Sequence, residues 1–181
     1  MEKRLSTPLP HEQFVHKFVR PMPGRTLIVG SRLYSEKPDR RKVYPDAIGI
    51  DMLPGDGVDL VLDLEEPLPA KLGTFEHVEC WSVLEHSKRP WKMAANITRL
   101  MAHGGTLHIS APFVWRVHNF PSDYFRYTKE GIRALFPGIS WHALAYAHEE
   151  LKMNDMVPVL AKGDGHPHLP RTEVLGFGHR P

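Results

Sequence analysis

Short runs of branched and apolar residues recur along the chain, and most of them end in a glycine, an acid or another polar residue. Runs of this kind, bounded by turn residues, predict β-strands, and the most apolar of them are typical of strands covered on both faces of a sheet. Five such runs are TLIVG from residue 26, AIGID at 47–51, VDLVLDLE at 58–65, FEHVECWS at 75–82 and TLHISAPF at 106–113.

Segments with apolar residues at helical spacing lie between these strands. In PWKMAANITRLMAHGG, Pro90 suits the first turn of an amphipathic helix, and Gly104-Gly105 stops that helix before the fifth strand. The other predicted helices are a short leading helix at 11–19, at most about two turns around DRRKVY within 31–46, and a helix at 129–136 that Thr128 caps.

The alternation of strands and helices predicts a doubly wound α/β domain, with a mostly parallel sheet and helices on both faces. SWHALAYAHE at 140–149 and TEVLGFGHR at 172–180 are candidates for closing strands. Ligands of such sheets bind beyond the carboxyl ends of the strands. Residues at the strand ends are therefore the first candidates for a binding site.

The composition, 41% hydrophobic and 24% charged over 181 residues, is that of a folded globular domain. No stretch approaches the roughly 20 apolar residues of a membrane span, and the N-terminus lacks the apolar centre of a signal peptide, so we expect a cytoplasmic protein without a membrane partner. The single cysteine, Cys80, excludes an intrachain disulfide and metal sites built on paired cysteines. Because the twelve histidines show no dense metal spacing, we expect no metal site. A net charge of +2 is too small to recruit nucleic acid by charge alone.

Acids at two neighbouring strand ends predict a nucleoside site. Asp51 follows Gly30 by about 21 residues, a spacing at which an acid can accept hydrogen bonds from the ribose hydroxyls of a cofactor. Asp63 and Leu64, at the next strand end, provide an edge for an adenine ring. The alternative is that both acids are merely solvated. The loop after the first strand, VGSRLYSEK, lacks the G-x-G-x-x-G that a dinucleotide pyrophosphate needs, which disfavours NAD.

The segment PFVWRVHNFPSDYFRYT at 112–128 places many aromatic residues among charged ones, beyond the fifth strand. Aromatic side chains there can form a substrate wall, and His118 or Asp123 can remove a proton from an attacking atom. In the alternative interpretation, the aromatic residues seal the core and Asp123 pairs with Arg126 to brace the loop.

Four stretches together resemble the class I S-adenosylmethionine-dependent methyltransferases of the methyltransferase type 11 group, over about residues 26–136. They are GID at 49–51, DLEEPLP at 63–69, FEHVECWSVLEH at 75–86 and RPWKMAANITRLMAHGGTLHISAPF at 89–113. The resemblance implies a Rossmann-like sheet of seven strands with a C-terminal antiparallel hairpin. It also implies S-adenosylmethionine as methyl donor and S-adenosylhomocysteine as product.

The resemblance implies a set of cofactor-binding residues at the strand ends. Arg32 falls where the family motif E-x-G-x-G-x-G has glycine, so its side chain must point away from the cofactor or pair with the cofactor's carboxylate. For Trp81 and His86 a packing role stays open, Cys80 is expected to be buried and idle, and Glu85 is expected to be structural. The implied residues are Gly30, Ser31, Arg32, Asp51, Met52, Asp63, Leu64, Cys80, Trp81, Ser82 and His86.

We therefore expect a methyltransferase with His118 as its first candidate base, Asp123 as the second, and Tyr124 and Arg126 as groups that orient the acceptor. The acceptor is unidentified, with a small molecule or sugar favoured, and nucleic acid is disfavoured because no N/D-P-P-Y motif is present. An inactive binding or assembly module is the main alternative, and a homodimer that covers the aromatic loop stays open. We expect a single domain over 1–181, with a leading helix and linker at 1–24, a cofactor-binding core at 25–150 and a C-terminal loop and closing strand at 151–181.

Overall fold

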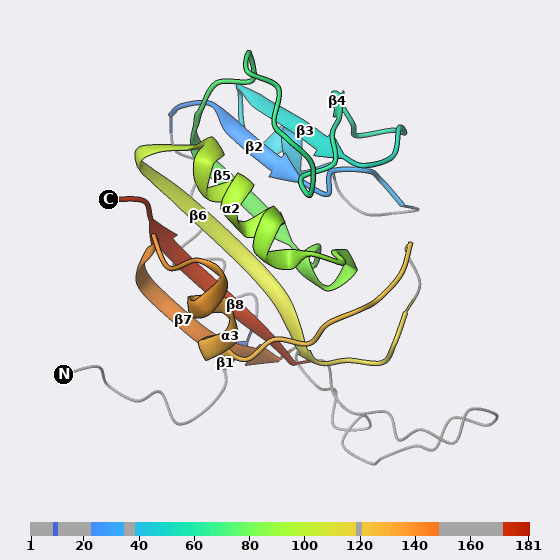
Figure 1. Cartoon of the computed structure of the whole chain (residues 1–181), viewed down its shortest axis with the longest axis vertical. Helices are drawn as coiled ribbons and strands as arrows, with labels where there is room; N and C mark the ends of the chain where they lie inside the picture. Colours follow the sequence, from blue (N-terminus) through green and yellow to red (C-terminus); the bar gives the residue numbers. More distant parts are fainter. Residues whose placement is uncertain (1–8, 11–22, 35–38, 119–120, 149–171) are drawn as a thin grey trace.

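The computed structural model describes residues 9–10, 23–34, 39–118, 121–148 and 172–181, which form one sheet with helices packed on it (Figure 1). The strand order is β1-β7-β8-β6-β5-β2-β3-β4, and only β8 runs antiparallel to its neighbours, β6 and β7. The strands are β1 (Leu9–Pro10), β2 (Thr26–Val29), β3 (Ala47–Asp51), β4 (Leu60–Val61), β5 (Phe75–Trp81), β6 (Met101–Val114), β7 (Ser140–His148) and β8 (Thr172–His179). The helices are η1 (Arg40–Val43), η2 (Leu84–His86), α2 (Pro90–Leu100) and α3 (Lys129–Leu135).

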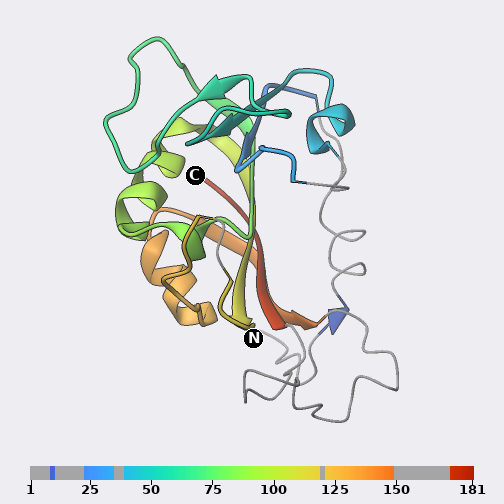
Figure 2. The ribbon, with the colours of Figure 1, turned by 90° about the vertical axis from the view of Figure 1, so that its right-hand side faces the viewer.

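This architecture confirms the predicted doubly wound α/β class, with its mostly parallel sheet and its C-terminal antiparallel hairpin of β7 and β8. The sheet has one strand more than the expected seven, because the two residues of β1 pair in parallel with the end of β7. Figure 2 shows α2 and α3 on one face of the sheet and η1 on the other. None of the described helices is long and apolar enough to cross a membrane.

β2 lies inside the sheet, between β3 and β5, and its four residues are all buried. On the face that α2 covers, Met93, Ala94, Ile97 and Leu100 face the sheet, and their helical spacing explains why this segment is an amphipathic helix. Burial of this stripe fixes α2 against the sheet. The first turn of α2 therefore lies next to the site described below.

The predicted cap at Thr128 is confirmed. Thr128 Oγ1 accepts a hydrogen bond from Gly131 N at 3.0 Å and starts α3. The short helix expected around DRRKVY is the single 3₁₀ turn η1, and the Asp39 carboxylate accepts from Arg41 N at 3.1 Å at its start.

Two strands differ from the prediction in length. Only Leu60–Val61 of the expected strand at 58–65 forms β4, because this edge strand pairs with β3 over two residues. β6 begins at Met101, directly after α2, although the strand was predicted to follow Gly104-Gly105. Gly104 has a φ of +76°, and the register of β5 and β6 shifts beside it, so the two glycines lie within the strand. The predicted leading helix at 11–19 lies outside the described residues.

Candidate functional site

A cavity of about 790 Å³ opens at the carboxyl ends of the central strands, where a doubly wound sheet binds its ligands. It extends from the loops after β2, β3 and β4 to η2, the start of α2 and the segment that follows β6. Nine of the eleven implied cofactor-binding residues line it: Gly30, Arg32, Asp51, Met52, Asp63, Leu64, Trp81, Ser82 and His86.

The other two implied residues, Ser31 and Cys80, do not line the cavity. Both are buried, and Cys80 has no exposed surface. Burial raises the pKa of the Cys80 thiol well above its ordinary value, so the thiol stays protonated and unreactive. Their positions place them in the packing behind the cavity wall.

The turn after β2 depends on Gly30. Its φ is +69°, and a Cβ at this position would lie 2.4 Å from Val83 Cγ2, so a larger residue would be strained and would also clash. The N–H groups of Gly30 and Ser31 both donate to Ile50 O, at 2.9 and 3.0 Å. These bonds fold the loop across the end of β3 and bring Arg32 to the cavity. The Arg32 guanidinium lies 5.1 Å from the centre of the Tyr34 ring, which also lines the cavity.

Backbone hydrogen bonds fix the two strand-end acids. Asp51 accepts from Leu53 N at 3.0 Å and from Arg32 N at 3.4 Å, and Asp63 accepts from Glu65 N at 2.8 Å. An ionised carboxylate has about four lone-pair positions, so both acids keep acceptor capacity for hydroxyl or amine donors in the cavity.

Glu65 joins the strand-end loops to the start of α2. Its carboxylate accepts from Ser87 Oγ and Lys88 N, each at 2.8 Å, and from Arg89 Nε at 2.8 Å. Burial alone would raise the pKa of Glu65, but the hydrogen bonds from Arg89, Ser87 and the backbone outweigh burial and lower it. The residue lines the cavity as a carboxylate, and the sequence pattern around it gave no reason to select it.

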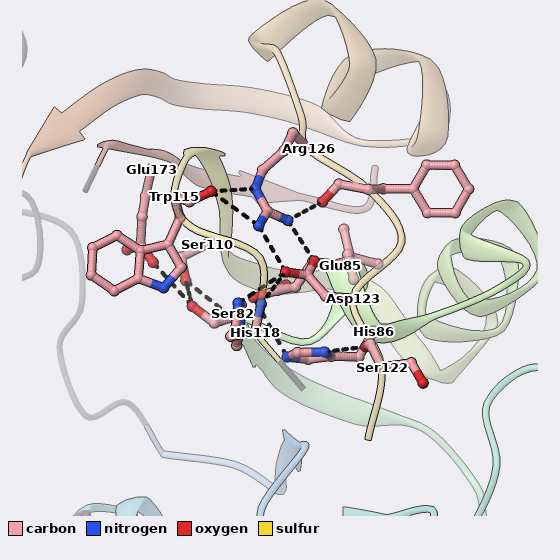
Figure 3. Close-up of polar contacts among 12 residues, drawn as sticks. Ser82, Glu85, His86, Ser110, Trp115, His118, Ser122, Asp123, Arg126 and Glu173 are labelled. Atoms are coloured by element: carbon pink, nitrogen blue, oxygen red, sulfur yellow. Dashed lines mark hydrogen bonds and ion pairs between the residues drawn. The ribbon is translucent and has the colours of Figure 1, made fainter. Parts of the chain in front are cut away.

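Of the four residues predicted to act on the acceptor, His118, Asp123 and Arg126 are joined by hydrogen bonds on the segment after β6 (Figure 3), and Tyr124 follows Asp123 in the sequence. Arg126 donates two hydrogen bonds to Asp123, from Nη1 to Oδ1 at 2.5 Å and from Nη2 to Oδ2 at 2.7 Å. Asp123 Oδ2 also accepts from His118 N at 2.9 Å and lies 3.0 Å from His118 Nδ1. Only His118 and Tyr124 of the four line the cavity. Asp123 and Arg126 thus form the brace of the alternative interpretation and hold His118 in place.

The Asp123 carboxylate is ionised in this brace. Burial by itself raises the pKa of Asp123, but hydrogen bonds from Arg126 and His118 N outweigh burial and lower the pKa. Arg126 also donates to Trp115 O from Nε and Nη2, at 3.2 and 3.1 Å, so the brace closes the loop on itself.

His86 and His118 face each other at one end of the cavity. Their ring centroids are 4.9 Å apart in an edge-to-face arrangement, and His86 Nδ1 lies 2.6 Å from Ser122 O. Burial lowers the pKa of His86 and favours its neutral form. Glu85, whose side chain is 1% exposed, lies behind them with Oε1 3.8 Å from His86 Nε2. The sequence interpretation treated Glu85 as structural, because nothing in V-L-E-H showed that His118 would join it.

The end of β5 also carries an unusual backbone conformation. Ser82 has a φ of +52°, which is uncommon for a residue other than glycine, and it lines the cavity. Its N–H donates to Ser110 O at 3.1 Å, and its hydroxyl donates to Glu173 Oε1 at 3.0 Å. These bonds to β6 and β8 hold the turn between β5 and η2.

No protein-family model matches the sequence, and no curated protein matches it significantly. Many solved structures do share the fold. The N-methyltransferase NodS from Bradyrhizobium japonicum, in complex with S-adenosylhomocysteine, is 12% identical, with a TM-score of 0.56 over 87% of this chain and 78% of that one. The YcgJ protein from Bacillus subtilis is 11% identical, with a TM-score of 0.64 over 93% and 97% of the two chains. The [4+2]-cyclase SpnF is 13% identical, with a TM-score of 0.63 over 94% and 80%.

The fold is therefore that of the class I S-adenosylmethionine-dependent methyltransferases, as the sequence resemblance implied. Identities this low establish the fold alone. Since SpnF has the same fold and is a cyclase, the activity of this chain has to be argued from its own site.

Proposed function

We propose that this protein transfers a methyl group from S-adenosylmethionine to an acceptor that enters the cavity beside His118. The observation that carries the proposal is the joint lining of one cavity by the strand-end acids and by the His86–His118 pair. The adenosine moiety would lie against Asp51 and Asp63, and the methionine moiety against the turn at the end of β5. The S-adenosylhomocysteine bound to NodS supports a cofactor of this chemistry in the same fold.

The remaining implied residues complete this proposed placement. Met52 and Leu64 would flank the adenine, while Trp81, Ser82 and His86 would approach the methionine moiety. Arg32 would pair with the cofactor's carboxylate, because it lines the cavity and carries a guanidinium where the family motif has glycine.

The transfer itself is a direct displacement. A lone pair of the acceptor forms the new bond to the methyl carbon, and the carbon–sulfur bond breaks with its electron pair moving to sulfur, so that neutral S-adenosylhomocysteine leaves. Holding the two reactants in line can contribute several kcal/mol, roughly up to 7–11 in the best-oriented cases. A positioned base adds about a hundred- to ten-thousandfold for an acceptor that must lose a proton.

His118 is the residue that we propose as the base that removes the acceptor's proton. Its Nδ1 faces the ionised Asp123 carboxylate, which only accepts, so Nδ1 carries the hydrogen and Nε2 keeps its lone pair. Asp123 and Arg126 are positioning residues, because neither reaches the cavity. Tyr124, which is 42% exposed and lies beside Lys88, is proposed to guide the acceptor, for which a small molecule or sugar remains our choice.

Calorimetric titration tests the cofactor proposal. The wild-type protein, Asp51→Ala and Asp46→Ala are each titrated with S-adenosylmethionine, S-adenosylhomocysteine and NAD. Asp46 is an exposed acid just before β3, at the opposite end of the strand from Asp51, and serves as the matched control. We expect the sulfur nucleosides to bind wild type and Asp46→Ala, and to bind Asp51→Ala at least tenfold more weakly.

Three outcomes would contradict this account. Preferential binding of NAD would show that NAD, and not S-adenosylmethionine, is the cofactor. Equal binding of the sulfur nucleosides to wild type and Asp51→Ala would show that the adenosine moiety does not lie against Asp51. Binding of none of the three would favour the inactive binding or assembly module, and would attribute the loss of affinity to the altered glycine loop around Arg32.

A further inference from the structure

Three side chains at the acceptor end of the cavity have the geometry of a cation site. One ring nitrogen from each of His86 and His118 and a carboxylate oxygen of Glu85 lie within 4.8 Å of one another. In the part of the chain that the structure describes, no other group of histidine, cysteine and acidic side chains is gathered in this way. The sequence hid the group, because Glu85 and His86 are adjacent on η2 while His118 comes from the segment after β6 (Figure 3).

The hydrogen bonds around the two histidines present their Nε2 atoms as ligands. His86 Nδ1 lies 2.6 Å from Ser122 O, and His118 Nδ1 lies 3.0 Å from Asp123 Oδ2. Both oxygens are acceptors, so each Nδ1 carries the hydrogen and each Nε2 keeps its lone pair. A carbonyl or carboxylate on the second nitrogen is the arrangement that orients metal-binding histidines in proteins.

The chemistry of the donors selects the kind of ion. Two imidazoles and one carboxylate suit divalent transition metals, and this set holds catalytic Zn²⁺ with a fourth position left for water or substrate. Ligand atoms on Zn²⁺ are roughly 3.4 Å apart at bond lengths of about 2.1 Å. The present separations, which extend to 4.8 Å, therefore need a contraction of up to about 1.4 Å. Glu85 offers a carboxylate oxygen from a side chain that is only 1% exposed, and the two histidines line the cavity.

We propose that Glu85, His86 and His118 bind one divalent transition-metal ion, with Zn²⁺ as the first choice, whose open coordination position faces the cavity. Binding of the ion does not depend on the proposed methyl transfer, whereas its use there rests on that function. An ion at this place would bind and polarise an oxygen of the acceptor. His118 would then hold the ion, and the ion would activate the acceptor in its place.

A second pair of histidines provides the control. His142 Nε2 and His179 Nδ1 are 2.8 Å apart near the far ends of β7 and β8, and their rings stack at 4.7 Å between centroids. These two nitrogens already share a hydrogen, and no carboxylate joins them in the described structure. Loss of the metal band in His142→Ala would therefore show that the metal binds adventitiously to these surface histidines.

The test is a titration of the chelator-treated full-length protein with Co²⁺, followed by visible absorption and then by displacement with Zn²⁺. We expect one site per chain, an absorption band in wild type and His142→Ala, and at least tenfold weaker binding in Glu85→Gln and His118→Ala. Asp123→Asn should weaken binding about 10- to 100-fold through the orientation of His118. Circular dichroism of each variant shows whether it is folded. If Glu85→Gln does not fold, the metal affinity of His118→Ala tests the proposal.

Absence of a Co²⁺ band in wild type, or a band that survives in folded His118→Ala, would overturn the proposal. Titration of the metal-free protein with S-adenosylmethionine separates this failure from that of the proposed function. Binding of S-adenosylmethionine without a metal band would contradict the metal site alone. A metal band without binding of S-adenosylmethionine would contradict the proposed methyl donor alone. If both are present, loss of activity on chelation and its return with Zn²⁺ are expected.

Discussion

The two ends of the cavity are built in different ways. At the strand-end side, Asp51 and Asp63 take their positions from the sheet, and backbone N–H groups of the adjoining turns hold their carboxylates. At the acceptor side, His118 depends on side chains, because Asp123 and Arg126 join residues of one loop to each other. The first end is therefore preorganised by the fold, whereas the second can be changed by altering a single ion pair.

The largest expected effect separates the two ends directly. His118→Ala should lower turnover about a hundred- to ten-thousandfold, because the acceptor loses the group that activates it. The affinity for S-adenosylmethionine should stay unchanged. Steady-state kinetics and calorimetry check this, with the exposed His103, whose Nδ1 lies 3.1 Å from Pro181 O, as the site of a control His103→Ala. Unchanged turnover in His118→Ala would remove the residue from the mechanism.

The ion pair that holds the acceptor side gives the next effect. Asp123→Ala should destabilise the protein by about 2–3 kcal/mol, less than the 3–5 for a fully buried pair because the Arg126 side chain is 26% exposed. The unfolding free energy from urea denaturation measures the change. Asp123→Asn, which can still accept from His118 N, should lose less. Equal stability of wild type and Asp123→Ala would mean that the brace does not hold the loop.

The strand-end side depends on the turn after β2, which Gly30 forms. Gly30→Ala should cost about 2–3 kcal/mol, since alanine there combines a left-handed φ with a clash against Val83. Gly104→Ala is the matched control: Gly104 has a similar φ of +76°, but nothing lies within 4 Å of an added Cβ. It should cost only about 1 kcal/mol in urea denaturation. Equal losses in both variants would show that contact with Val83 is unimportant.

The smallest effect concerns Glu65, which joins the strand-end loops to the start of α2. Its folded pKa lies below the ordinary value of 4.5, so its contribution to stability is present above about pH 4.5 and is lost as the pH falls through the folded pKa. In Glu65→Gln this part of the pH dependence should disappear. Denaturation midpoints of both proteins between neutral and acidic pH measure it. Parallel pH profiles would show that the carboxylate gains nothing from Ser87, Lys88 and Arg89.

The sequence predicted the strand-end side better than the acceptor side for a physical reason. Branched runs identified β2, β3 and β5 nearly to the residue, and acids at the ends of neighbouring parallel strands meet at one edge of the sheet. The lengths of β4 and β6 were missed, because pairing at a sheet edge and a glycine-containing register shift are decided by neighbouring strands. The cluster at Glu85 was missed as well, since it requires a loop to return onto η2, as in the contact of His86 with Ser122, 36 residues away.

The most direct test of the central claim is a crystal structure of the protein with S-adenosylhomocysteine. We expect the ribose hydroxyls to lie within hydrogen-bond distance of the Asp51 carboxylate, the adenine to lie beside Asp63, and the sulfur to point toward His118. A ligand bound outside this cavity, or bound with the adenine at the His118 end, would contradict it.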